Sequence, residues 1–287
     1  MQCLHLNLDG AWQDGELDVP EIDMRHWGPR LRYCAPDAEV EAFDKSLPDP
    51  LCPFILYGSG DFHYLAALWV RRAARRAVGG MNPGQLTVVS FDNHPDWDVR
   101  PPRWACGGWI CRALEIPQLR ASVWGCGNFE LAWPARLFAN RAALADGRLT
   151  VHAWAERHKP AVCRRFGCMS RADWRERFEA FATGLAGSDV YVTVDLDCLR
   201  KGEAVTNWEN GLFTADDVAW AIGRLCDAAR VIGGDLCGAW SRPAYARWRQ
   251  HFAGNWDHPK FPQPDESHAR RVNSAALAKI WPALTGV

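Results

Sequence analysis

The chain has 287 residues, of which 48% are apolar, and a formal net charge of −1. This length allows one large α/β domain or two small ones. The balanced charge argues against a nucleic-acid binder, and no apolar run approaches the roughly 18 residues of a membrane helix. Because no basic segment leads into an apolar one at the N-terminus, we expect a cytoplasmic protein without a membrane partner. The 11 cysteines are odd in number and lack paired zinc spacing, which favours reduced, buried thiols.

Runs of β-branched and apolar residues alternate with helical patterns along the chain. Such alternation predicts a three-layer α/β/α fold with a mostly parallel central sheet. Short connections leave no linker, so we expect a single domain over residues 1–287. The expected strands are 4–8, 54–57, 86–91, 121–124, 149–153, 191–194 and 230–232. The expected helices are 64–78, 133–145, 171–185, 214–229 and 267–284, with a surface excursion over 242–266.

The helix expected at 214–229 carries its own start signal. Thr214 is a hydroxyl residue suited to capping the first turn, and Asp216 and Asp217 follow within that turn. Acids there complement the helix dipole, so we interpret these two carboxylates as structural.

Polar side chains follow two of the expected strands. Asp92-Asn93-His94-Pro95-Asp96 comes after 86–91, and Asp195-Leu196-Asp197 comes after 191–194. Strand residues two apart point to the same side, so these side chains are predicted to converge where the strands end. Four carboxylates and an imidazole are costly to bury together unless a cation neutralises them. The pattern therefore predicts a site for two divalent metals with oxygen and imidazole ligands.

A third segment, Gly58-Ser59-Gly60-Asp61-Phe62-His63, precedes these two. In this order the three segments resemble the Gly-Gly-Asp-His, Asp-Ala-His-x-Asp and Ser-Phe-Asp-x-Asp blocks of the arginase, agmatinase and formiminoglutamase family, the ureohydrolases. Asn210-Gly211-Leu212 stands where that family carries Gly-Gly-Leu. The likeness spans residues 54 to 240. The extra Phe62 would turn His63 to the other face of a strand, so the backbone is expected to bulge or turn here.

The resemblance implies an arginase-like fold and a binuclear manganese centre. Two Mn²⁺ ions would hold a bridging hydroxide that attacks a C–N bond. Members of the family often form trimers or hexamers, so a homo-oligomer is compatible with the resemblance. The implied metal ligands are His63, Asp92, His94, Asp96, Asp195 and Asp197.

A single Zn²⁺ is an alternative to two manganese ions. Histone-deacetylase-like enzymes of the same broad superfamily use one metal bound by Asp, His and Asp. Asp92, His94 and one of Asp195 or Asp197 could serve in this way. The adjacent histidine pair of those enzymes is absent from this sequence, which makes this the weaker version.

The sequence departs from the family where protons and substrate are handled. The family's shuttle histidine has no counterpart, and Cys106 is the nearest match. Gly238 stands where guanidino-cleaving members carry the glutamate that holds the guanidinium, which argues against arginine or agmatine as substrate. Glu209 is the best local group for acid/base catalysis or substrate orientation. Asp61 and Asp98 are either acceptors that orient the histidines or turn residues.

Two functions follow as expectations. The first is a metal-dependent hydrolase of a non-peptide C–N bond in a small amide, amidine or formimino compound. The alternative is a non-catalytic metal-binding or regulatory protein that kept the arginase-like scaffold. The missing shuttle histidine and the missing glutamate motivate the second.

Overall fold

The computed structural model describes residues 2–12, 19–77 and 86–286. Eight strands form one sheet in the order β2-β1-β4-β10-β9-β5-β7-β8, and every neighbouring pair is parallel. The strands are β1 Cys3–Asn7, β2 Glu21–Asp23, β4 Phe54–Leu56, β5 Leu86–Phe91, β7 Arg120–Cys126, β8 Leu149–Ala153, β9 Asp189–Asp195 and β10 Arg230–Cys237. A separate antiparallel pair joins β3 Cys34–Ala35 to β6 Trp104–Ala105.

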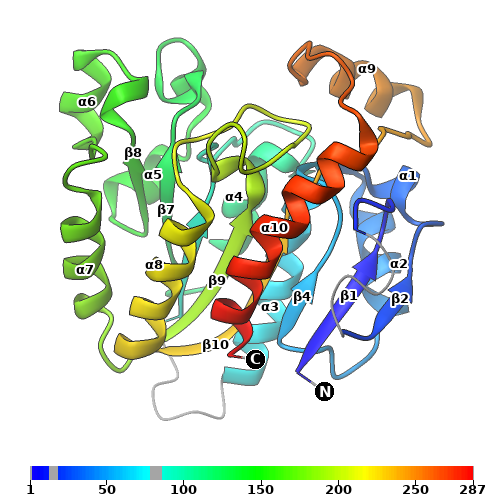
Figure 1. The fold of residues 1–287 in the computed structure, drawn as a ribbon, viewed down its shortest axis with the longest axis horizontal. Helices are drawn as coiled ribbons and strands as arrows, with labels where there is room; N and C mark the ends of the chain where they lie inside the picture. The colour runs from blue at the N-terminus through cyan, green and yellow to red at the C-terminus, as the bar shows by residue number, and fades with distance from the viewer. Residues whose placement is uncertain (1, 13–18, 78–85, 287) are drawn as a thin grey trace.

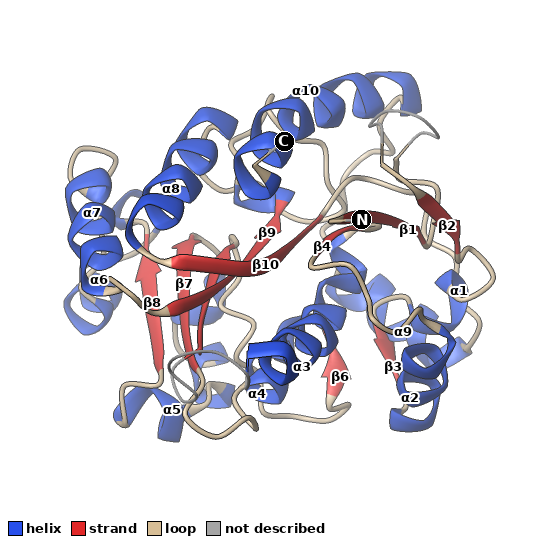
Figure 2. Cartoon of the chain, turned by 90° about the horizontal axis from the view of Figure 1, so that it is seen from below, coloured by secondary structure: helices blue, strands red, loops and turns tan. Residues whose placement is uncertain are grey.

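Helices cover both faces of the sheet (Figures 1 and 2). α7, α8 and α10 pack on one face, and α3 and α4 on the other, which confirms the expected three-layer α/β/α fold. The α-helices are α1 Gly28–Leu31, α2 Asp37–Ser46, α3 Ala66–Ala77, α4 Trp109–Ala113, α5 Arg141–Ala145, α6 Pro160–Phe166, α7 Trp174–Gly184, α8 Ala215–Ala228, α9 Trp248–Asp257 and α10 Glu266–Thr285. The 3-10 turns are η1 Gly60–Leu65, η2 Cys106–Gly108, η3 Phe129–Leu131, η4 Ala135–Phe138, η5 Ala155–Arg157 and η6 Leu196–Cys198.

The central strands are apolar on both sides because each side meets a helical layer. All residues of β5 and β9 are buried, as is usual for strands inside a parallel sheet. Two cores result, one under α3 and α4 and one under α7, α8 and α10. Because all neighbouring strands are parallel, their carboxyl ends lie at one edge of the sheet, at the top of Figure 1.

One expectation for the chain path was wrong, and another was incomplete. The helix expected over 133–145 is broken, because Asn140 caps a new helix by accepting a hydrogen bond from the Ala143 amide (3.1 Å). The surface excursion expected over 242–266 contains helix α9. Gln250 anchors α9 by donating to the carbonyl of Arg32 (2.8 Å). The strand β2 was not predicted, and Val78 lies outside the described residues.

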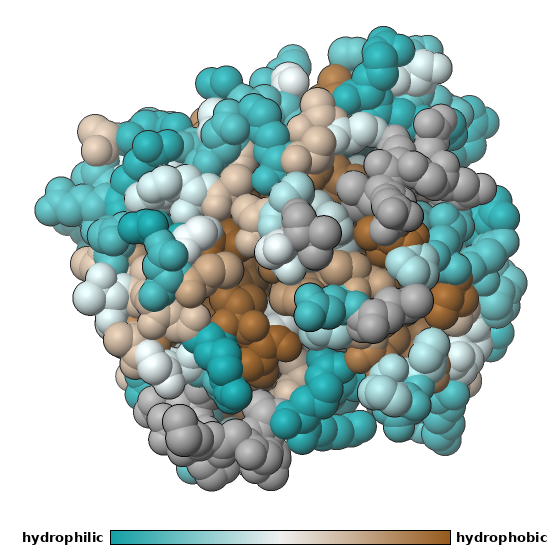
Figure 3. Space-filling view, turned by 60° about the horizontal axis from the view of Figure 1, so that its bottom comes forward, coloured by the Kyte–Doolittle hydropathy of each residue, from teal (hydrophilic) through white to brown (hydrophobic). Residues whose placement is uncertain are grey.

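A cavity of about 1000 Å³ lies at the other end of the strands. It is lined mainly by apolar residues at the start of β1, β4 and β10, and a brown hollow marks this face in Figure 3. None of the predicted site residues lines it. None of the helices in the described part of the chain is long and apolar enough to cross a membrane.

The cap predicted at Thr214 is present. Its hydroxyl accepts from the Asp217 amide (3.0 Å), and the Asp217 carboxylate accepts from the Thr214 amide (3.0 Å). We expect Thr214→Ala to lower the free energy of unfolding by about 1 kcal/mol, because one amide of the first turn loses its acceptor. Urea denaturation measures this. The control is Thr183→Ala, whose hydroxyl bonds only a carbonyl within α7. An equal loss in both variants would contradict the capping role.

Candidate metal centre

The segment after β5 folds into a tight turn. The strand ends at Phe91, and the His94 amide donates to Asp92 Oδ1 (2.7 Å). Asp96 has a left-handed backbone (φ +46°) that returns its side chain toward Asp92. Asp92, His94 and Asp96 thus converge as predicted, but through a turn and not through strand alternation.

The segment after β9 does the same. Asp195 is the last strand residue, and its Oδ1 accepts from the Asp197 amide (3.0 Å). Asp197 Oδ1 in turn accepts from the Asn93 amide (3.0 Å), which joins the two segments. Each carboxylate is buried, and backbone amides satisfy part of its hydrogen-bonding capacity.

His63 reaches the same place from η1, the turn that the extra Phe62 required. Its Nε2 lies 2.9 Å from the Thr193 hydroxyl, which donates its only proton to Asp235 Oδ1 (2.8 Å). The hydroxyls of Tyr57 and Tyr191 also donate to Asp235. Because Thr193 spends its proton on Asp235, it must accept from Nε2 of His63. This places a proton on Nε2 and directs Nδ1 toward the acids, where it can carry a second proton or bind a cation.

That Nδ1 atom is the best test of whether the residues fit a metal. It is buried without a hydrogen-bond partner, yet it faces Asp92 Oδ2 (3.1 Å), Asp96 Oδ2 (3.3 Å) and Asp195 Oδ2 (3.6 Å). These carboxylates call for positive charge at this point, supplied either by a proton on Nδ1 or by a metal ion bound to the Nδ1 lone pair. Burial alone would lower the pKa of His63, but the carboxylates of Asp92 and Asp96 raise it well above its ordinary value. The cluster therefore attracts a cation.

A second imidazole makes a second group. His94 Nδ1 lies 2.8 Å from Asp197 Oδ2 and 3.5 Å from Asp92 Oδ1. The two oxygens of Asp92 thus face different histidines, Oδ2 toward His63 and Oδ1 toward His94. Two sets of donor atoms share this carboxylate, His63/Asp92/Asp96 and Asp92/His94/Asp197. Two adjacent cations fit this arrangement better than one.

Burial raises the pKa of two acids in the cluster. Burial, followed by the Asp92 carboxylate, raises the pKa of Asp96 to about 8. Burial and the neighbouring Asp195 raise the pKa of Asp197 well above its ordinary value. Like charges that cannot all ionise together are relieved by protons or by metal ions.

A small cavity of about 30 Å³ opens above the cluster. Six carboxylates line it: the four already described, Glu130 and Asp257. Lysine and arginine are absent from its described lining. The Oε2 oxygen of Glu130 is buried without a partner, and burial raises the pKa of Glu130 to about 7. Trp208 forms part of the wall.

The remaining predicted residues lie around this cavity. Glu209 Oε2 lies 3.6 Å from His94 Nε2, and this contact lowers the pKa of Glu209. Cys106 lines the cavity, and burial raises the pKa of its thiol well above the ordinary value. A Cβ on Gly238 (φ +102°) would lie 2.2 Å from Asp195 Oδ1. A side chain cannot be placed there without moving Asp195.

Asp61 and Asp98 make their contacts with residues other than His63 and His94. Asp98 accepts from Arg100 Nε (2.9 Å). Asp61 is buried between Arg32 Nε (2.6 Å) and His258 Nε2 (2.6 Å). The contacts predicted for these two acids are made by other residues. Thr193 contacts His63, and Glu209 contacts His94.

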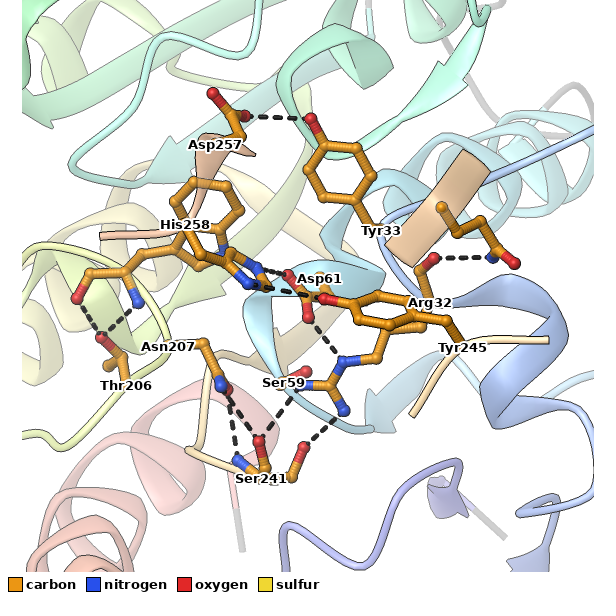
Figure 4. A network of polar contacts seen from close by, with 12 residues as sticks. Arg32, Tyr33, Ser59, Asp61, Thr206, Asn207, Ser241, Tyr245, Asp257 and His258 are labelled. Carbon is orange, nitrogen blue, oxygen red and sulfur yellow. Dashed lines mark hydrogen bonds and ion pairs between the residues drawn. The ribbon is translucent and has the colours of Figure 1, made fainter. Parts of the chain in front are cut away.

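Asp61 belongs to a network that ties the α9 segment to the rest of the site (Figure 4). Arg32, 1% exposed, also donates to the Ser241 hydroxyl (2.8 Å). The Tyr33 hydroxyl donates to Asp257 Oδ2 (3.0 Å) at the end of α9. Sequence reasoning missed Asp257 because 242–266 carries no strand that would have directed it to this edge. Glu130 could have been found from the sequence, because it follows shortly after the end of strand β7.

Comparisons with known proteins agree with this architecture. No family model and no curated protein matches the sequence. Among solved structures, arginase from Bacillus subtilis has 13% identity and a TM-score of 0.54, covering 99% of this chain and 98% of its own. Arginase from Medicago truncatula has 15% identity and a TM-score of 0.51, covering 98% and 86%.

A third neighbour is formimidoylglutamase from Bacillus subtilis, with 14% identity and a TM-score of 0.51, covering 99% of this chain and 87% of its own. Identities this low establish the fold alone. They confirm what the three ordered motifs predicted: this chain has the fold that arginases share with formimidoylglutamase.

Proposed function

We propose that this chain is a single-domain, metal-dependent hydrolase of a non-peptide C–N bond in a small molecule. The observation that carries the proposal is the buried Nδ1 atom of His63, which the contact of Nε2 with Thr193 directs toward three carboxylate oxygens. The structural similarity to arginases and formimidoylglutamase supports the proposal, since those proteins share this fold.

Two divalent ions are the proposed cofactors, with Mn²⁺ the first candidate. Their ligands would be His63, Asp92, Asp96 and Asp195 on one side, and Asp92, His94 and Asp197 on the other. When bound, such a pair polarises the scissile group and lowers the pKa of water, which supplies a nucleophile near neutral pH. A single Zn²⁺ is less favoured, because Asp92 divides its oxygens between two histidines.

The other residues take supporting roles. Glu209 is the proposed acid/base or orienting group: it lies at the rim beside His94, where a carboxylate can hold that ring or exchange a proton with substrate. Cys106 is a wall residue in this proposal, since a thiol with a raised pKa exchanges protons poorly at neutral pH.

The acidic lining of the cavity indicates which class of substrate it would bind. Two divalent ions would balance four of its six carboxylates, and the other two are the exposed Asp257 and the buried Glu130, whose pKa burial raises to about 7. A protonated amidine or formimino group bound beside Glu130 would favour the ionised carboxylate, and Trp208 in the wall offers an aromatic ring to a cation. We therefore favour these substrates over neutral amides.

The first prediction concerns metal content. Wild-type protein incubated with Mn²⁺ and desalted should retain about two equivalents by elemental analysis, because both donor sets are intact. Asp92→Ala/Asp195→Ala should retain none. The matched control is Asp216→Ala/Asp227→Ala, two exposed acids of α8, which should bind as wild type does. Retention by the first variant, or none by the wild type, would contradict the proposed centre.

The second prediction concerns substrate charge. Acetamidinium should bind the manganese-loaded protein at least tenfold more tightly than acetamide, its neutral analogue of the same size. Relaxation of the probe's methyl protons by Mn²⁺ measures both affinities. Glu130→Gln should weaken acetamidinium by about tenfold, near 1.4 kcal/mol, and leave acetamide unchanged. Glu179→Gln, an exposed change on α7, is the control. Equal affinities for the two probes would refute a cationic substrate.

Turnover separates the enzyme from the non-catalytic alternative. A panel of amidine, formimino and amide compounds should contain one that the manganese-loaded protein hydrolyses with ammonia or amine release. Glu209→Gln should then lower kcat by about 10²-fold, in the range of a lost acid/base group, with metal content unchanged. Full metal occupancy without turnover of any compound would favour the metal-binding or regulatory protein.

A further inference from the structure

One thiol reaches the proposed metal centre from the end of β10, directly before Gly238. Cys237 is the last residue of β10, fully buried, and lies opposite Asp195 in the parallel pairing of β10 with β9. Its Sγ is 3.7 Å from Asp195 Oδ2. Like the acids of the cluster, it stands at the end of a strand.

Cys237 lies beside one donor set and not the other. The atoms that His63, Asp195 and Cys237 offer all fall within 4.8 Å of one another. Asp195 Oδ2 is the common neighbour, since it also lies 3.6 Å from the unpartnered Nδ1 of His63. Around His94 and Asp197, the described donor sets contain only nitrogen and oxygen.

The backbone holds this thiol in place. Gly238 packs so closely against Asp195 that an added Cβ would lie 2.4 Å from the Leu196 amide nitrogen. The end of β10 therefore cannot retreat from β9 without losing their pairing. The sulfur stays beside the oxygen that faces His63.

We propose that Cys237 is a ligand of the ion held by His63 and Asp195, and that this position selects a thiophilic ion such as Zn²⁺ or Co²⁺. The position formed by Asp92, His94 and Asp197 keeps the preference of a hard site for Mn²⁺. On binding, the thiol releases its proton to solvent and a sulfur lone pair forms the bond to the ion, with no change of oxidation state. This inference rests on the proposed metal centre. It gives one of the two metal positions a sulfur ligand and the other only nitrogen and oxygen ligands.

Cobalt tests the sulfur bond directly. Wild-type protein titrated with Co²⁺ should develop a near-ultraviolet thiolate-to-cobalt charge-transfer band that saturates at one equivalent. Cys237→Ser should lose the band while keeping the visible bands of bound cobalt. Cys198→Ser, an equally buried thiol next to Asp197 but outside the donor sets, should keep both. Loss of the charge-transfer band in Cys198→Ser alone would overturn the assignment.

Competition tests the selectivity. Because Zn²⁺ binds most sites more tightly than Mn²⁺, zinc is limited to one equivalent per chain and Mn²⁺ is in large excess. The wild type should then retain one equivalent of each, and Cys237→Ser should lower the zinc-to-manganese ratio about tenfold. If that variant does not fold, X-ray absorption of zinc-loaded wild type decides. A sulfur neighbour at about 2.3 Å supports the proposal, and only nitrogen and oxygen neighbours overturn it. Bound cobalt without a charge-transfer band removes the sulfur ligand but leaves the metal centre, whereas no binding of Mn²⁺, Co²⁺ or Zn²⁺ removes both.

Discussion

The carboxyl edge of this sheet is organised by the mutual repulsion of four buried carboxylates. Asp92, Asp96, Asp195 and Asp197 lie within one small volume where water cannot screen them. The fold tolerates them through backbone amides, since the amides of Asn93, His94 and Asp197 each donate to one of these acids. The amides do not neutralise the negative charge of these carboxylates. The two divalent cations proposed above would balance it.

The fold was predictable because its strands are buried on both sides. Continuous apolar runs such as 86–91 cannot be mistaken for amphipathic surface strands, and their spacing required helical crossovers. The site was predictable for the same reason: carboxylates directly after such runs must lie at the shared edge. The sequence pattern did not contain the turn at Asp96 or the cap at Asn140, which depend on single residues whose local hydrogen bonds override periodicity.

Long-range contacts account for most of what sequence reasoning missed. Asp61 looked like a partner for His63, but Arg32 and His258 claim it from positions 29 and 197 residues away. Asp257 reaches the cavity because α9 is anchored on the α1–β3 segment, and Cys237 lies beside Asp195 because β10 pairs with β9. Contacts of this kind follow from the assembled fold and leave no periodic signal. Thr193 was likewise unremarkable in sequence, although its contact with Asp235 decides which nitrogen of His63 faces the acids.

Gly238 carries an implication for the redesign of this site. Guanidino-cleaving members of the family that the sequence resembles carry a glutamate near this position, whereas here the backbone has φ +102° and lies against Asp195. A side chain at this position would push aside Asp195, one of the proposed metal ligands. Guanidinium binding therefore cannot be engineered by one substitution here, and a designed carboxylate would have to stand on another wall of the cavity.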